Sequence, residues 1–171
     1  MSFLPADQQE PAHTPLRLGV SGLGGWLILI QIGLYVTLIQ LVIQINQYTI
    51  PSFESETWNA LTSKGADLYH VLWKPAILFE AVFNLGMFVM TIFCLAFMYM
   101  RKRIFPKLMI VYYSVSLLGG IADYALVQTI SSDVGLDLDN SLRDTFRAVV
   151  TCSIWIPYFL RSERVANTFL R

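Results

Sequence analysis

Long apolar runs, interrupted by single polar residues at helical spacing, are the main pattern of this chain. A helix that crosses the hydrocarbon core of a bilayer needs about 20 mostly apolar residues. Segments of this kind, the last one weaker than the others, lie at about residues 26–47, 76–100, 107–130 and 144–161. The pattern predicts an all-α integral membrane protein, folded as an antiparallel four-helix transmembrane bundle.

Each predicted span carries one stripe of polar or small residues. Successive residues of a helix turn by about 100°, so residues three or four apart share a face. The stripes are Gly33, Thr37, Gln40, Gln44 and Gln47; Glu80, Asn84, Met87, Thr91, Cys94 and Met98; Tyr112, Ser116, Gly119 and Asp123; and Arg143, Arg147, Thr151 and Tyr158. Because unsatisfied polar groups are costly in hydrocarbon, we expect these faces to pack against one another.

The polar residues of different spans fall at similar depth. Counted from the span ends, the outer half contains Gln40, Gln44, Glu80, Asn84, Asp123, Arg143 and Arg147. One interpretation is a set of ion pairs between Arg147 and Glu80 or Asp123 that fixes the helix register. Another is a ligand or proton site, because ionisable groups within a membrane often mark pathways. Arg147 has a further option, which is to extend to water. Direct Arg–carboxylate contacts favour the first interpretation and an open cavity favours the second.

Composition agrees with a membrane protein, and the charges give it an orientation. Of 171 residues, 55% are hydrophobic and 14% charged, which leaves too little polar surface for a soluble domain. Cations follow the second and fourth spans, at Arg101, Lys102, Arg103, Lys107, Arg161, Arg164 and Arg171; acids fill the other loops, at Glu54, Glu56, Asp67, Asp133, Asp137, Asp139 and Asp144. The positive-inside rule predicts that both termini are cytoplasmic and that the basic residues contact the inner leaflet. This simpler role makes a nucleic-acid site unnecessary.

The remaining segments suggest little chemistry. Residues 1–21, rich in proline, are expected to be a disordered cytoplasmic tail, and residues 22–171 the membrane domain. Cys94 and Cys152 are expected to be small core residues roughly 15 Å apart in depth, beyond disulfide reach. His13 and His70 have no second ligand at metal-binding spacing, so we expect neither metal nor cofactor.

Two loop features carry structural predictions. The aromatic segment 50–75 is expected to lie on the membrane surface as two short interfacial helices, divided by Lys64-Gly65 with Asp67 capping the second. Pro157 is expected to bend the last span, because proline frees a backbone carbonyl inside a helix.

Several motifs are similar to those of domain-of-unknown-function family 2569. They are Gly-Leu-Gly-Gly-Trp-Leu at 22–27, Phe79-Glu80 with Asn84, Phe105-Pro106-Lys107, and Ile154-Trp155-Ile156-Pro157-Tyr158-Phe159 leading into Ser162, Arg164-Val165 and Thr168-Phe169. The resemblance runs from Gly22 to Phe169. It implies a four-span protein of the bacterial inner membrane without an assigned role, and it supplies no catalytic residue.

The sequence thus favours a non-enzymatic, multi-pass accessory or interaction subunit. Its expected partners are the lipid bilayer and either another membrane protein or a second copy of the chain. The alternative is a small transporter or proton-coupled binding protein that uses Glu80, Asp123 and Arg147.

Overall fold

The computed structural model describes residues 22–66, 68–134 and 140–169, and over these residues it contains helices and no strands. The predicted disordered tail, the Asp67 cap and most of the acidic loop before Asn140 lie outside the described residues. In chain order the elements are α1 (Trp26–Gln44), the π-helix η1 (Ile45–Thr49), α2 (Ile50–Ser52), α3 (Ser55–Thr62), α4 (Trp73–Tyr99), α5 (Phe105–Val134), α6 (Asn140–Arg161) and α7 (Glu163–Thr168).

Three segments of the described chain are long and apolar enough to cross a membrane: Trp26–Ser52, Trp73–Tyr99 and Phe105–Asp133. They correspond to the first three predicted spans, each slightly longer than expected. The fourth predicted span forms α6, which does not belong to this group. Its sequence includes Arg143, Asp144 and Arg147 near the start and Arg161 at the end, and these charges lower its hydropathy.

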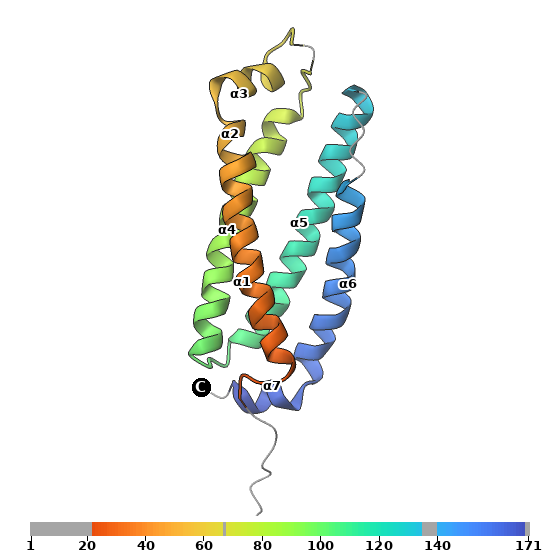
Figure 1. Ribbon diagram of the computed structural model, residues 1–171. Coiled ribbons are helices and arrows are strands. Elements are labelled where there is room, and N and C mark those ends of the chain that lie inside the picture. The colour runs from red at the N-terminus through yellow and green to blue at the C-terminus, as the bar shows by residue number, and fades with distance from the viewer. Residues whose placement is uncertain (1–21, 67, 135–139, 170–171) are drawn as a thin grey trace, which may run out of the picture.

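The long helices α1, α4, α5 and α6 run side by side, while α7 lies below them and α3 above them (Figure 1). We call the two extremities the α7 end and the α3 end. Each long helix packs against the next long helix along the chain: α1 against α4, α4 against α5, and α5 against α6. Helix α1 meets α6 near the α7 end, where the rings of Trp26 and Trp155 pack edge to face at 6.2 Å.

An aromatic core fills the α7 end. The buried ring of Phe105 lies 4.5 Å from that of Phe169 and 5.9 Å from that of Phe159. Leu27 and Met98 are buried in the same cluster, so α1, α4, α5, α6 and the α7 segment all contribute to it. Phe169 therefore faces the protein core, although its motif also suits contact with the inner leaflet.

A clasp joins the two ends of the described chain. The Gly22 amide donates to Thr168 Oγ1 at 2.9 Å, and the Arg164 guanidinium packs on the Gly24-Gly25 backbone. A Cβ atom at Gly24 would lie only 3.0 Å from Arg164 Nη1, and Gly25 has a φ of 62°. The positive φ therefore favours glycine at position 25, whereas a side chain at position 24 would require the Arg164 guanidinium to shift by a few tenths of an ångström. Two motifs from opposite ends of the sequence thus form one contact.

The end of the first span widens into a π-helix because of Pro51. Proline has no amide hydrogen, and its ring clashes with the carbonyl four residues earlier in a regular α-helix. In η1 the Ile50 amide bonds instead to Ile45 O, five residues back. This wider turn allows the helix to continue as far as Ser52.

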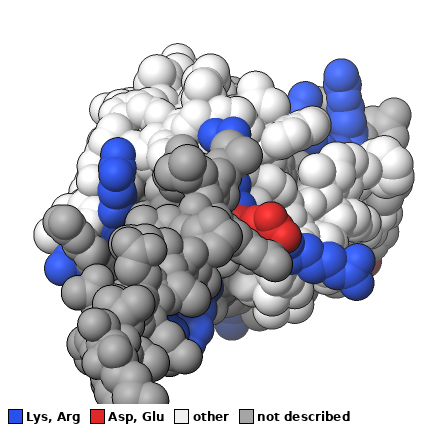
Figure 2. Space-filling model, turned by 90° about the horizontal axis from the view of Figure 1, so that it is seen from below, with Lys and Arg blue, Asp and Glu red and all other residues white. Residues whose placement is uncertain are grey.

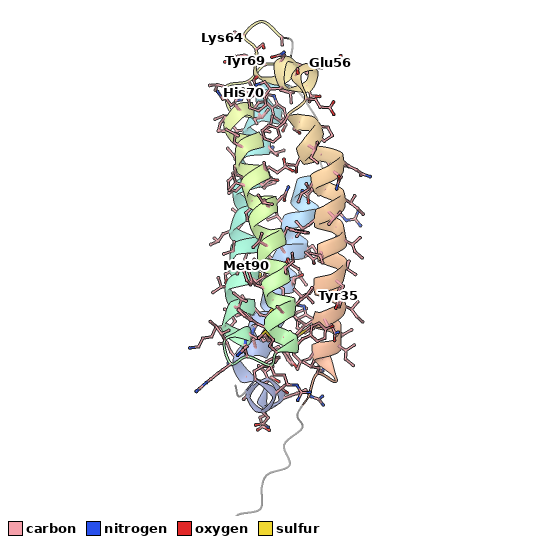
Figure 3. All side chains as sticks on the ribbon, turned by 90° about the vertical axis from the view of Figure 1, so that its left-hand side faces the viewer. Tyr35, Glu56, Lys64, Tyr69, His70 and Met90 are labelled. Carbon is pink, nitrogen blue, oxygen red and sulfur yellow. The ribbon has the colours of Figure 1, made fainter. Side chains whose placement is uncertain are left out.

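The loop between α2 and α4 differs in part from its prediction. Helix α3 forms, and the rings of Phe53 and Trp58 stack at 5.7 Å beside it. The second short helix is absent from residues 68–72, which form turns and irregular backbone. Here the His70 Nδ1 accepts from the Leu72 amide at 3.2 Å, a local side-chain bond that competes with helix formation. Figure 3 places His70 with Lys64 and Tyr69 at the α3 end.

Basic side chains surround the α7 end. Figure 2 views this end and shows Lys and Arg at several points around its rim. The basic residues after the second and fourth spans, Arg101, Lys102, Arg103, Lys107 and Arg161, are exposed, whereas Arg164 is half-buried in the clasp. The described acids of the loops, Glu54, Glu56 and Asp133, belong to the opposite end.

Candidate functional site

A cavity of about 680 Å³, partly open to the outside, lies between the four long helices. We call it the polar cleft. Its volume falls within the range of small-molecule sites, about 300–1,000 Å³. It is lined by Thr37, Gln40, Leu41 and Gln44 of α1; Phe79, Glu80, Phe83, Asn84 and Met87 of α4; Tyr112, Ser116, Gly119, Gly120, Asp123 and Val127 of α5; and Thr145, Arg147 and Ala148 of α6.

The predicted stripes of the two central helices face the interior. Asn84, Met87, Thr91, Cys94 and Met98 of α4 are all buried. On α5, Tyr112 and Gly119 are buried, and Ser116 and Asp123 are half-buried on the wall of the cleft. These two stripes are confirmed because α4 and α5 each pack against a helix on both sides.

The corresponding prediction for the two outer helices holds only in part, since Tyr158 of α6 packs against the core but other members of these stripes are exposed. The buried face of α1 is apolar and consists of Leu27, Ile30, Leu34 and Leu41. Gln40 and Gln47 are exposed, as are Arg143 and Arg147 on α6. The polar stripe of α1 lies beside its buried face, where Thr37, Gln40 and Gln44 line the cleft. A polar stripe can mark the wall of a cavity as well as a packed interface, and here it marks the wall.

A chain of hydrogen bonds closes the floor of the cleft. Thr91 Oγ1 donates to Met87 O at 2.7 Å, so the Tyr112 hydroxyl, 3.0 Å away, is the donor to Thr91. Thr91 is fully buried and Tyr112 is 4% exposed. The two buried hydroxyls are therefore both hydrogen-bonded, and Tyr112 is one of the residues that line the cleft.

The carboxylates of the cleft have few partners. Gln44 Nε2 donates to Glu80 Oε1 at 3.4 Å, and Asn84 donates to Thr49 Oγ1 at 3.4 Å, next to the π-helix. Among the described residues, the one contact between a carboxylate and a basic side chain joins His70 Nε2 to Asp133 Oδ2 at 3.0 Å. Glu80, Asp123 and Arg147 therefore share the wall of a cavity without direct pairing, and the ion-pair interpretation of this cluster has no contact to support it.

Most of the predicted cluster comes together. Gln40, Gln44, Glu80, Asn84, Asp123 and Arg147 all line the cleft, whereas Arg143 is exposed and does not. The polar stripes did not include two aromatic residues of the wall, Phe79 and Phe83. Phe79 and Phe83 of the wall stack on each other at 5.7 Å, and the Phe83 ring lies against Gly119, where an added Cβ would come within 2.1 Å of it. Phe79 and Phe83 are four residues apart, and Phe79 precedes Glu80. This spacing could have predicted that the two rings pack together near Glu80.

Cys94, Cys152 and His70 are not among the residues that line the polar cleft. Cys94 and Cys152 are both buried and free, and the Cys152 thiol donates to Tyr113 O at 3.2 Å. Over the described ranges, no group of three or more His, Cys, Asp or Glu side chains is placed to hold a metal ion.

Comparison with known proteins places the chain in a family. A family model described as "Protein of unknown function (DUF2569)" matches residues 20–170, which is most of the chain. No curated protein matches the chain. No solved structure matches it either. The chain belongs to the DUF2569 family, whose function is unknown.

Proposed function

We propose that the protein is a four-span protein of the bacterial inner membrane that binds a small polar ligand in the polar cleft. Three of the crossings are the apolar segments that contain α1, α4 and α5. The fourth is α6, whose 22 residues extend about 33 Å at 1.5 Å per residue, enough to cross hydrocarbon. Near the charged start of α6, Arg147 lines the cleft, which offers its charge a polar surrounding.

The charge distribution supports an orientation with both termini in the cytoplasm. The α7 end has the exposed residues Arg101, Lys102, Arg103, Lys107 and Arg161, which the positive-inside rule assigns to the cytoplasm and to anionic lipid headgroups. The α3 end then faces outward. In this orientation Phe53 and Trp58 beside α3 lie at the outer membrane interface, which suits aromatic rings.

The observation that carries the binding proposal is the unpaired state of the charges in the cleft. Removing charged groups from water is costly unless they find partners. Glu80 and Asp123 line a common cavity and no described cation pairs with them. A bundle that needed these residues for packing alone would bring them into direct contact with Arg147. A cavity that leaves them available favours binding.

Labelling of introduced cysteines tests this proposal. In a protein with Cys94→Ala and Cys152→Ser, we expect Gln40→Cys and Ser116→Cys in the cleft to react with an impermeant maleimide added outside intact cells. Leu34→Cys, 3% exposed in the core, is the control and should stay unlabelled. Equal, negligible labelling at all three positions would refute an outward-facing cleft. Lys64→Cys and Lys102→Cys report the orientation, and only the former should react from outside.

The accessory-subunit role that the sequence favours is a second candidate, supported by an apolar groove. The groove, of about 350 Å³, is lined by Gly86, Val89, Met90, Phe93, Phe97 and Leu108. It lies away from the polar cleft on the face of α4 that Figure 3 marks with Met90. Small residues such as Gly86 allow a partner helix to approach closely in lipid.

Co-purification from native membranes tests this second role. Gly86→Leu should fill the groove and remove a bound partner or second copy. Gly33→Leu is the matched control, because Gly33 also has open space around it but lies on α1. Identical co-purification with both variants would argue against the groove as a docking site.

A further inference from the structure

We infer that the ligand of the polar cleft is an organic monocation, a protonated amine with an apolar or aromatic portion. This inference rests on the proposed function and specifies the chemical class that the site binds. It follows from three properties of the cleft wall: its charge, its hydrogen-bonding groups and its aromatic surface.

The charge of the wall favours a cation. Glu80 on α4 and Asp123 on α5 line the same cavity, on two helices that pack together. Like charges in a site of low dielectric repel each other, and a cation between them relieves both. Arg147 is the basic residue of the described lining, and it is exposed. Water therefore solvates the Arg147 guanidinium better than it would solvate a cation held between Glu80 and Asp123.

The hydrogen-bonding groups of the wall require a ligand that donates. An ionised carboxylate is an acceptor only, with two oxygens. Glu80 receives one long bond from Gln44, which leaves most of its acceptor capacity open. Over the residues that the structure describes, no hydrogen bond to the Asp123 carboxylate is present. An ammonium group supplies charge and several donors together.

The aromatic surface gives the ligand its second property. Phe79 and Phe83 stack one helical turn apart and line the same cleft as Glu80. Phe83 also crosses to Gly119 of α5, so its ring lies between the helices that carry the two carboxylates. Aromatic faces attract cations within about 6 Å and also bury apolar groups. An amine with an attached apolar group satisfies both kinds of contact.

A matched series of three probes tests the inference. Purified full-length protein in nanodiscs of phosphatidylcholine and phosphatidylglycerol is equilibrated with radiolabelled phenethylammonium, 2-phenylethanol or phenylacetate. The probes have the same ring and similar length but differ in charge. We expect the cation to bind at least about tenfold more tightly than the other two, as a charge-assisted contact should.

Amide variants assign the carboxylates. Glu80→Gln and Asp123→Asn should each weaken phenethylammonium binding by about tenfold, the loss typical of one charged hydrogen bond, while 2-phenylethanol binding stays unchanged. The unchanged neutral probe shows that each variant is folded. Glu56→Gln, an exposed carboxylate on α3 outside the cleft, is the matched control and should have no effect. Arg147→Gln should leave cation binding unchanged or tighten it.

Results that contradict the cation assignment differ from results that contradict the proposed binding function. Equal affinity for the three probes, or tightest binding of phenylacetate that Arg147→Gln removes, would overturn the cation assignment. Absence of binding by all three would overturn it too, while the binding proposal stands if the cleft cysteines are labelled. If those cysteines are inaccessible, the proposed function itself fails. Addition of phosphatidylethanolamine to the nanodiscs distinguishes two sources of the amine. If this lipid competes with phenethylammonium, the natural ligand is a lipid headgroup. If it does not compete, the ligand is a soluble amine.

Discussion

The two ends of this helical protein solve the same packing problem in different ways. At the α7 end, aromatic rings from different helices interlock around the buried ring of Phe105. Nearer the α3 end, the same four helices line a cavity of about 680 Å³ whose walls carry amides and charges. One end is filled by side chains, and the other leaves space.

The difference shows how a small bundle can maintain a cavity. Helix α1 reaches α6 and α7 through Trp26, Gly22 and the Gly24-Gly25 backbone, all at the α7 end. Towards the α3 end, Gln40 and Arg147 remain exposed on the two outer helices. The packed α7 end thus holds α1, α4, α5 and α6 together. The fold can therefore persist without side chains that fill the polar cleft.

Phe105 is the centre of the aromatic core at the α7 end, and removal of its ring should have the largest effect on stability. We expect Phe105→Ala to destabilise the protein by about 3–5 kcal/mol, because it leaves a large cavity beside Phe159 and Phe169. The measurement is thermal unfolding of the purified protein followed by tryptophan fluorescence. Phe93→Ala is the control, since this side chain is 52% exposed and should cost far less. Similar losses for both variants would mean that the α7 end is not the stabilising base.

Inside the cleft, the close approach of Phe83 to Gly119 should have a smaller effect on stability. We expect Gly119→Ala to cost about 1–3 kcal/mol, because its methyl group would collide with the Phe83 ring. Gly120→Ala is a matched control one residue away, where nothing lies within 4 Å of the added carbon. Thermal unfolding of the two variants should separate them clearly. If both are neutral, the Phe83 ring moves freely into the cleft and does not form a fixed wall.

The clasp is the next contact to test. Thr168→Val keeps the shape of the side chain but removes the acceptor for the Gly22 amide and should cost about 1–2 kcal/mol. Thr129→Val is the control, because that exposed hydroxyl donates only to Ala125 O within its own helix. Hydrogen exchange should become faster at the Gly22 amide in the first variant alone. Unchanged exchange there would show that Arg164 holds the clasp without Thr168.

The sequence predicted the helices well and the cleft only in part. On α4 the 100° periodicity identified the buried stripe from Asn84 to Met98, because a central helix has a single interior face. On α1 the same periodicity selected Gln40 and its neighbours, although Leu34 and Leu41 are the buried residues. Residue spacing defines a face of a helix but does not reveal whether side chains or empty space lies opposite it.

Contacts between segments that are far apart in the chain also could not be predicted from the sequence. The glycines at 22–25 and the closing motif around Arg164 were both noticed as motifs, yet nothing in their spacing shows that they touch. The π-helix was more accessible to prediction, since Pro51 within an apolar helical run requires a local change of hydrogen bonding.

At the α3 end, His70 links the loop before α4 to α5, and we expect this contact to contribute least to stability. Since His70 Nδ1 accepts from the Leu72 amide, its hydrogen is on Nε2 and points to Asp133. The Asp133 side chain is 59% exposed, so water and salt weaken the attraction. We expect Asp133→Asn, which keeps an acceptor, to change stability by less than about 1 kcal/mol, and by still less in 1 M salt. A larger loss that persists in high salt would show that this contact closes the α3 end as firmly as aromatic packing closes the other.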